Sequence, residues 1–180
     1  RRFFRYRCEY ALGYVDTATV QRAELIMKEL DLEPEDRRIV EPARGCIKSA
    51  EMQGKGNAGI YCGAAIELHD GTIVTGKNSP LMHAASSLVL NAIKTLAGIP
   101  DDIHLLAPGI IESIGSLKKD ILNSKTISLD LEETLIALSV STTTNPTSQM
   151  AMAKLKQLKN CEVHLTHIPT PGDETGLRRL

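Results

Sequence analysis

The sequence has almost no net charge, and it shows neither a long apolar run nor a secretion signal. Its 21 lysines and arginines nearly balance 22 aspartates and glutamates, for a formal net charge of −1. This balance argues against a non-specific nucleic-acid binder, which usually carries a basic excess. No apolar run approaches the roughly 20 residues that a membrane-spanning helix needs, and the first residues show no signal-peptide pattern. We therefore expect a cytoplasmic protein that binds neither membranes nor nucleic acids.

Motifs that hold metals or cofactors are missing as well. The four cysteines show no C-x-x-C spacing, and scattered cysteines of this kind usually serve as small buried hydrophobic residues. The glycine-rich run at residues 54–56 lacks the spacing and the following Ser or Thr of a P-loop. We expect no cofactor, no disulfide framework and no metal site. The cysteines are Cys8, Cys46, Cys62 and Cys161.

Aromatic residues are few, and five of the six lie within the first fourteen residues, interleaved with arginines. A basic aromatic cluster suits nucleic-acid stacking, but we favour a helix face packed on an adjoining domain or subunit, because aromatics dominate buried contacts. The chain also begins without Met. We therefore expect a fragment whose partners are the missing N-terminal domain of the same protein and a second copy in a homo-oligomer. The five aromatics are Phe3, Phe4, Tyr6, Tyr10 and Tyr14.

The order of predicted elements divides the chain into two parts. Helical patterns cover residues 1–12, 17–30 and 42–52, and the flexible run GKGNAG follows at residues 54–59. We predict a helical subdomain at residues 1–56 and an α/β subdomain at residues 57–180. The second part alternates strands with helices, which favours a three-layer α/β/α sandwich with helices on both faces. Its predicted strands are residues 60–68, 72–77, 103–107 and 161–167, and its predicted helices begin near residues 79, 108, 130, 146 and 173.

Residues 64–112 follow the order of the cytidine-deaminase fold, in which two metal motifs open two helices. Zinc deaminases need three metal ligands and a Glu that carries the proton. Of these four residues, only one metal ligand has a counterpart here, which is His83. Ala85 occupies the position of the Glu, and Gly109 and Glu112 occupy those of two Cys ligands. The sequence therefore resembles a deaminase-like scaffold without its zinc and without its reaction.

Helix N-termini offer a different chemistry, because their free N–H groups and positive dipole end suit anions. We expect the helices after Asn78 and Ala107 to face each other, with Lys77, Asn78, Ser79 and His83 around the first. Thr144 and Asn145 open a third helix of this kind. These residues predict a pocket for a small phosphorylated or carboxylate ligand. The alternative is that Ser79 and Asn145 only cap their own helices.

The segment 161–174 holds two histidines and two acidic residues. On a strand, residues three apart point to opposite faces, so His164 and His167 should not share one metal ion. His167, Thr170 and Asp173 follow the carboxyl end of the predicted strand, where α/β proteins tend to bind ligands. We therefore include His167 and Asp173 among the predicted ligand-binding residues.

Three long runs resemble an uncharacterised bacterial family, domain of unknown function 1846, and the resemblance covers essentially the whole chain. It implies the C-terminal part of a protein more than twice as long, with no established reaction. Our first hypothesis is a non-deaminating module that binds a small anionic ligand or a partner domain. The others are an enzyme whose active site is shared with the missing half, using Lys77, Asn78, His83 and His167, and a packing or oligomerisation module. The runs are GKNSPLMHAASS at residues 76–87, SLDLEETL at residues 128–135 and THIPTPGDE at residues 166–174.

Overall fold

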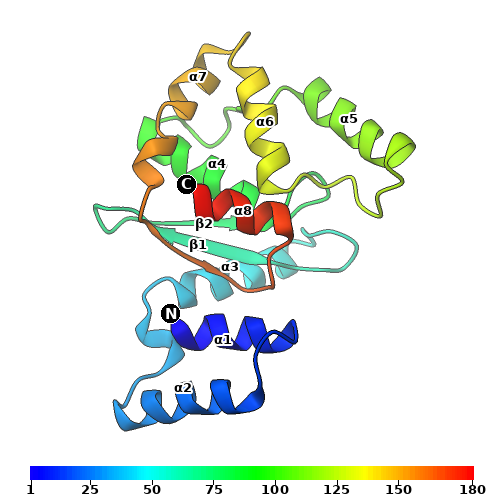
Figure 1. Ribbon diagram of the computed structural model, residues 1–180. Coiled ribbons are helices and arrows are strands. Elements are labelled where there is room, and N and C mark those ends of the chain that lie inside the picture. The colour runs from blue at the N-terminus through cyan, green and yellow to red at the C-terminus, as the bar shows by residue number, and fades with distance from the viewer.

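The computed structural model describes residues 1–180 and is a mixed α/β fold (Figure 1). None of its helices combines the length and apolar character needed to cross a bilayer. The helices are α1 (Arg2–Ala11), α2 (Thr17–Glu29), α3 (Val40–Met52), α4 (Ala84–Ala97), α5 (Pro108–Ser116), α6 (Leu131–Ser141), α7 (Pro146–Met152) and α8 (Pro171–Arg179), with short helical turns η1 (Pro34–Asp36), η2 (Leu117–Ile121) and η3 (Leu155–Leu158). The strands are β1 (Gly63–Glu67), β2 (Ile73–Lys77) and β3 (Glu162–Leu165).

The sheet has three strands in the order β2-β1-β3, and β1 runs antiparallel to both neighbours. The tight turn between β1 and β2 forms as predicted, because Gly71 adopts a φ of 83° and the Asp70 carboxylate accepts the Thr72 N–H at 2.9 Å. In the resulting register Ala65 lies opposite Thr75 on one side and His164 on the other.

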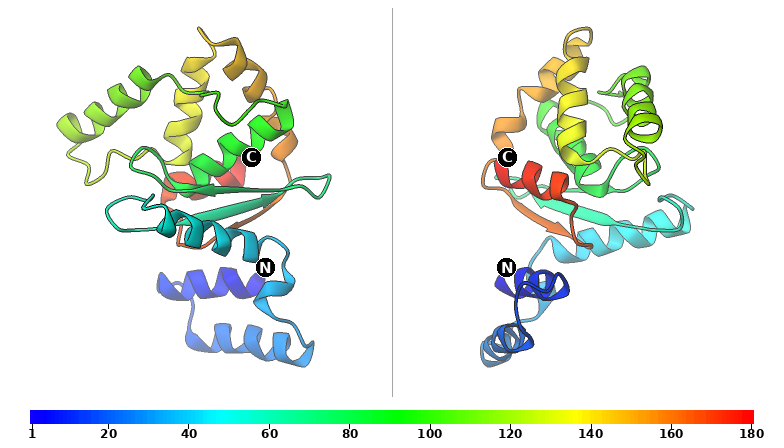
Figure 2. Two further views of the ribbon diagram at one scale, coloured as in Figure 1. Left: turned by 180° about the vertical axis from the view of Figure 1, so that it is seen from behind. Right: turned by 45° about the vertical axis from the view of Figure 1, so that its right-hand side comes forward.

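Helices cover both faces of this sheet, with α3 on one face and α4 on the other (Figure 2). Two glycines allow the close approach. A Cβ on Gly76 would lie 2.5 Å from the Leu88 Cα in α4, and a Cβ on Gly63 would clash with the Ala43 carbonyl oxygen in α3. The main core then forms on the α4 side, where helices α6 and α7 add fully buried residues such as Leu138 and Ala151.

One predicted strand is wrong. Residues 103–107 form an irregular segment and pair with no strand. Two of their apolar side chains are buried all the same, since Leu105 and Leu106 belong to the core, and the Ser148 hydroxyl donates to the Leu105 carbonyl at 2.5 Å. A short apolar run is compatible with any buried segment, so its composition could not separate a strand from a buried loop. The mixed α/β class is confirmed, whereas the deaminase-like topology stays a prediction.

The start of α4 also differs from the prediction. The helix begins at Ala84 with His83 at the N-cap position, four residues after the predicted cap. Ser79 instead closes a turn, in which its hydroxyl oxygen accepts from Leu81 N and Met82 N, both at 3.2 Å. Chain 128–130 runs alongside this turn, because His83 N donates to the Leu129 carbonyl at 2.9 Å. Ser79 is therefore a turn residue and not a helix cap.

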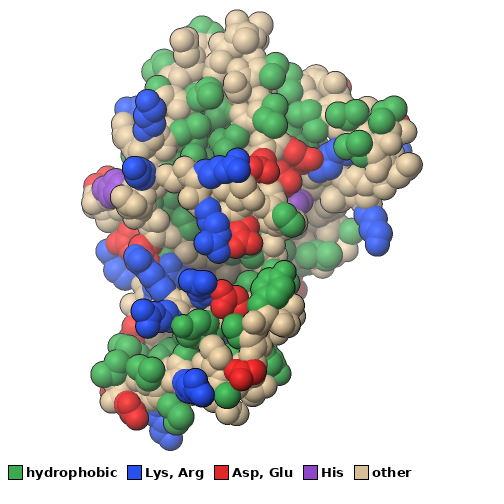
Figure 3. All heavy atoms as spheres, in the orientation of Figure 1, with side chains coloured by type: hydrophobic (Ala, Val, Ile, Leu, Met, Phe, Trp, Pro, Cys, Tyr) green, Lys and Arg blue, Asp and Glu red, His purple; other side chains and the backbone are tan.

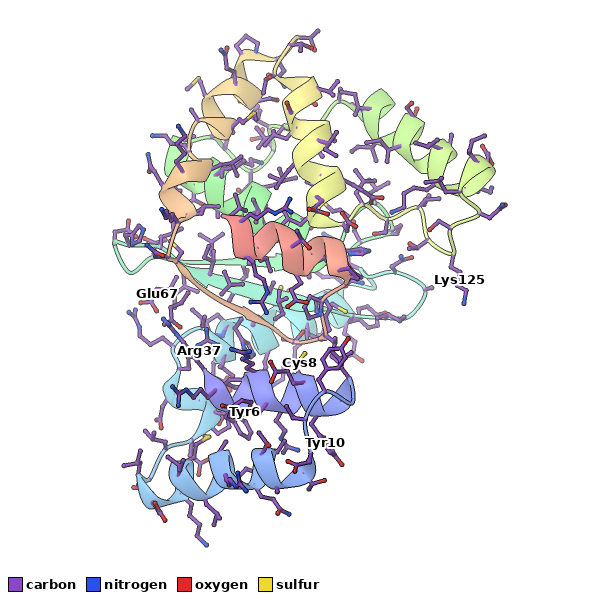
Figure 4. All side chains as sticks on the ribbon, viewed as in Figure 1. Tyr6, Cys8, Tyr10, Arg37, Glu67 and Lys125 are labelled. Atoms are coloured by element: carbon purple, nitrogen blue, oxygen red, sulfur yellow. The ribbon has the colours of Figure 1, made fainter.

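The first two helices pack mainly on each other, on the α3 side of the α/β layers (Figure 1). Helix α3 packs on the sheet, so the packing favours a division between α2 and α3, and the boundary at residue 56 stays a prediction. Helix α1 contacts the sheet through Phe4, whose ring meets that of His164 edge-on at 4.6 Å between centroids. Arg37 lies between α1 and the sheet (Figure 4) and donates to the Val163 carbonyl at 2.8 Å.

Candidate functional site

The structure divides the predicted site residues among three places. The first is a polar cavity of about 440 Å³ beside the end of β2, where Lys77, Asn78 and Ser79 meet the loop at residues 54–56 and one side of α4. Its walls carry no carboxylate and, apart from Pro80, no apolar side chain. Two lysines, Lys55 and Lys77, give the cavity a positive charge, and neither forms an ion pair with any acidic residue of the chain.

Partly buried hydrogen bonds hold the cavity walls in place. The Asn78 side chain accepts from Cys62 N at 2.8 Å and donates to the Ile60 carbonyl at 2.9 Å, which ties the end of β2 to the segment before β1. On α4, the Asn91 amide donates to the Thr75 carbonyl at 2.9 Å. Asn78 is thus a structural residue of the wall. The lysine ammonium groups remain available to a ligand, since Lys77 Nζ donates only to the neutral Gln53 Oε1, at 3.2 Å.

The second place is the buried carboxylate of Asp173, where the N-termini of α4, α6 and α8 converge. Each helix supplies one donor. His83 Nδ1 lies 2.8 Å from Asp173 Oδ2, Leu131 N lies 3.0 Å from Oδ1, and the Thr170 hydroxyl lies 2.8 Å from Oδ2. The predicted pairing of α4 with the helix after Ala107 is not what surrounds this carboxylate, because α6 and α8 join α4 and α5 supplies no donor. The anion at the centre is the protein's own carboxylate.

The pKa values around Asp173 follow from this geometry. Burial by itself raises the pKa of Asp173, but the hydrogen bonds from His83 and Thr170 outweigh it and hold the pKa below its usual value. The hydrogen bond to Asp173 raises the pKa of His83. Since a carboxylate only accepts, Nδ1 of His83 carries the proton, which leaves Nε2 to exchange one. Such a His–Asp pair suits proton transfer.

His167 lies beside this pair and two residues beyond the end of β3, so the predicted alternation of faces with His164 along one strand stays a prediction. Burial lowers the pKa of His167, with Asp173 opposing and His83 reinforcing that shift. Its Nδ1 atom is buried and has no hydrogen-bond partner. The chain contains no group of three or more His, Cys, Asp and Glu side chains arranged to hold a metal ion.

Thr144 and Asn145 lie in the third place, apart from both groups, which corrects the predicted shared site. Helix α6 begins at Leu131, which binds Asp173, and residues 142–145 follow its far end. Its 11 residues separate the two ends by about 16 Å at the usual rise per residue, and the turn lies at the top of Figure 1. Asn145 caps α7 by accepting from Thr147 N at 2.9 Å.

Sequence reasoning missed Lys55 and Leu131 as members of these groups, and it named Thr170 beside Asp173 without including it among the predicted site residues. Thr170 and Leu131 act through a hydroxyl and a backbone N–H that carry no distinctive signal in a single sequence. A signal did exist for α6, because Asp130 and Glu133 form the predicted capping box, with Glu133 N donating to Asp130 at 2.9 Å. The capping box marks a helix N-terminus but does not reveal what that N-terminus faces.

Comparison with known proteins decides the family. The family model described as "Domain of unknown function DUF1846, C-terminal" matches residues 35–180. The chain belongs to this family. The resemblance inferred from the three sequence runs is therefore confirmed, and the matched region of the DUF1846 family begins at η1, near the division that the packing favours.

Curated relatives of this DUF1846 chain are longer proteins. A UPF0371 protein of Clostridium botulinum (strain Alaska E43 / Type E3) is 48% identical over 181 residues, which cover 100% of this chain and 36% of that relative. A UPF0371 protein of Clostridium botulinum (strain Langeland / NCTC 10281 / Type F) is 47% identical, with the same coverage. The chain thus spans about a third of the length of these relatives.

Proposed function

We propose that this part of the DUF1846 family binds a small phosphorylated or carboxylate ligand in the polar cavity. The observation that carries the proposal is the pair of lysines, Lys55 and Lys77, in a cavity without a carboxylate. A positive cavity with no internal counter-charge is suited to an external anion. In contrast, the helix N-termini around Asp173 already enclose an anion.

Replacing Lys77 with glutamine should weaken the binding of pyrophosphate about 10–100-fold, because a hydrogen bond from a charged donor contributes roughly 1.5–3 kcal/mol. Lys55→Gln should have a similar effect. Isothermal titration calorimetry at low ionic strength measures both, with pyrophosphate as the probe. Lys156→Gln is the matched control, since Lys156 is an exposed lysine of η3 and does not line the cavity. Pyrophosphate binding that is equal in all four proteins would contradict the proposal.

The proposed module is deaminase-like in arrangement but not in reaction. The layers α3, sheet and α4 support the proposed three-layer topology. Ala85, at the position of the deaminase Glu, is fully buried in the core, so that position has no room for a proton-carrying carboxylate. Gly109 and Glu112, at two ligand positions, are both exposed. We place the module in a longer cytoplasmic protein.

The exposed apolar surface of α1 and α2 favours a second role, as a contact for the rest of that longer protein. Helix α1 buries no residue and α2 buries only Val20. Leu25, Ile26 and Leu30 are 55–62% exposed, and apolar side chains gather over these helices in Figure 3. Contiguous exposed apolar surface of this kind marks interaction sites.

Hydrogen exchange tests this contact. We expect the α2 amides to be protected from exchange at least tenfold more strongly in a full-length Clostridium botulinum UPF0371 protein than in this chain alone. The reason is that burial of α2 suppresses the local unfolding through which its amides exchange. The amides of α6 serve as the internal control. Equal protection of α2 in both proteins would refute the contact. Protection that rises with the concentration of this chain would instead assign the surface to a second copy in a homo-oligomer.

A further inference from the structure

A second cavity, of about 390 Å³, lies next to the polar cavity and has the opposite character. It opens between α4, the segment 101–108 and the start of α5, and its walls are largely apolar side chains. The two cavities share two wall residues, Ser87 and Asn91, one helical turn apart on α4. Its apolar wall residues include Leu81, Met82, Leu90, Ile103, Leu106 and Ile111.

We propose that the two cavities form one site for an organic phosphate with an aliphatic body. This inference rests on the proposed function, because it places the phosphate between Lys55 and Lys77. The body then crosses α4 at Ser87 and Asn91 and lies between Leu81 and Ile111. Each cavity lies within the usual size range of ligand pockets, about 300–1,000 Å³.

The chemistry of the second cavity selects an aliphatic body over a nucleobase. Its walls contain no Phe, Tyr or Trp, the side chains on which bases stack. Met82 and Leu90 are flexible or branched aliphatic residues that pack against alkyl groups. The ammonium of Lys94 at its edge is bound to the Asp101 carbonyl at 2.7 Å, so it offers no free charge to a second phosphate. The ligand therefore carries its charge at one end only.

A series of monoalkyl phosphates tests this site directly, with pyrophosphate as the reference probe for the head group. Affinity should rise roughly threefold to fourfold for each added methylene, on the order of 100-fold between butyl and octyl phosphate. Ile103→Asp should remove this dependence on chain length and leave pyrophosphate binding unchanged. Ile127→Asp is the matched control, since Ile127 is a loop isoleucine of similar exposure, 45% against 40% for Ile103, outside both cavities.

The outcomes separate this inference from the proposal on which it rests. Pyrophosphate binding that depends on Lys77, without any dependence on alkyl length, would overturn the aliphatic site and leave the anion cavity standing. A length dependence that persists in Ile103→Asp would also overturn it, by assigning the alkyl chain to another apolar surface such as α1 and α2. Absence of binding by pyrophosphate and by every alkyl phosphate would overturn both proposals.

Discussion

Replacement of Asp173 with alanine is expected to lower the free energy of unfolding by about 3–5 kcal/mol, the usual effect of breaking a buried charged network. The carboxylate is fully buried and accepts from His83, Leu131 and Thr170. Its removal leaves those donors, at the N-termini of three helices, without an acceptor. For a chain of this size the loss corresponds to a fall in melting temperature of about 6–20 °C, measurable by calorimetry and urea unfolding.

Two comparisons make this result specific. Asp173→Asn should cost less than alanine, because the amide keeps a carbonyl oxygen that can accept from Leu131 N. Asp102→Ala, at an exposed turn aspartate without a side-chain hydrogen bond, should change the unfolding free energy by less than about 0.5 kcal/mol. A loss below about 1 kcal/mol in Asp173→Ala, within the range of an ordinary surface effect, would contradict the network.

Acidification from pH 7 to pH 4 should destabilise the contact between α1 and the sheet through His164. Burial lowers the pKa of His164 to about 4, and the charges of Arg37 and Arg44 act in the same direction. An unfolded histidine takes up its proton near pH 6.5, before the folded one. Stability is therefore fully present above pH 6.5 and falls between pH 6.5 and 4, by roughly 2–3 kcal/mol.

A non-titrating ring at this position isolates the effect. His164→Phe keeps an aromatic partner for Phe4 and should flatten the pH dependence of the unfolding free energy, measured with urea at pH 7 and pH 4.5. His104→Phe, at an exposed histidine, should leave the slope of the original protein unchanged. An unchanged slope in His164→Phe would show that His164 does not protonate differently in the folded and unfolded states.

Features set by neighbouring residues could be predicted from the sequence. The Asp70-Gly71 turn, the Asp130 capping box and the Asn145 cap each depend on side chains within three residues of the backbone they bind. Local chemistry of this kind is visible in a single sequence. The prediction of a strand at residues 103–107 was wrong because strand pairing depends on partners far away in the chain, which a local pattern does not reveal.

The candidate site was predictable in its residue types but not in its grouping. Lys77, Asn78 and Ser79 are consecutive, and the structure keeps them at one cavity. The Asp173 network joins residues that are distant in the sequence, because His83 lies 90 positions and Leu131 lies 42 positions before Asp173. Only the folded core brings these residues together. The sequence predicted that α4 would face the helix after Ala107, whereas α6 and α8 meet it at Asp173, because a sequence does not specify which helix N-termini come together.

A crystal structure determined after soaking with pyrophosphate is the most direct test of anion binding in the polar cavity. We expect density for the anion in the polar cavity, within hydrogen-bond distance of the Nζ atoms of both Lys55 and Lys77. An ordered cavity without pyrophosphate at a saturating concentration, or pyrophosphate bound only beside His83 or at another surface, would contradict it.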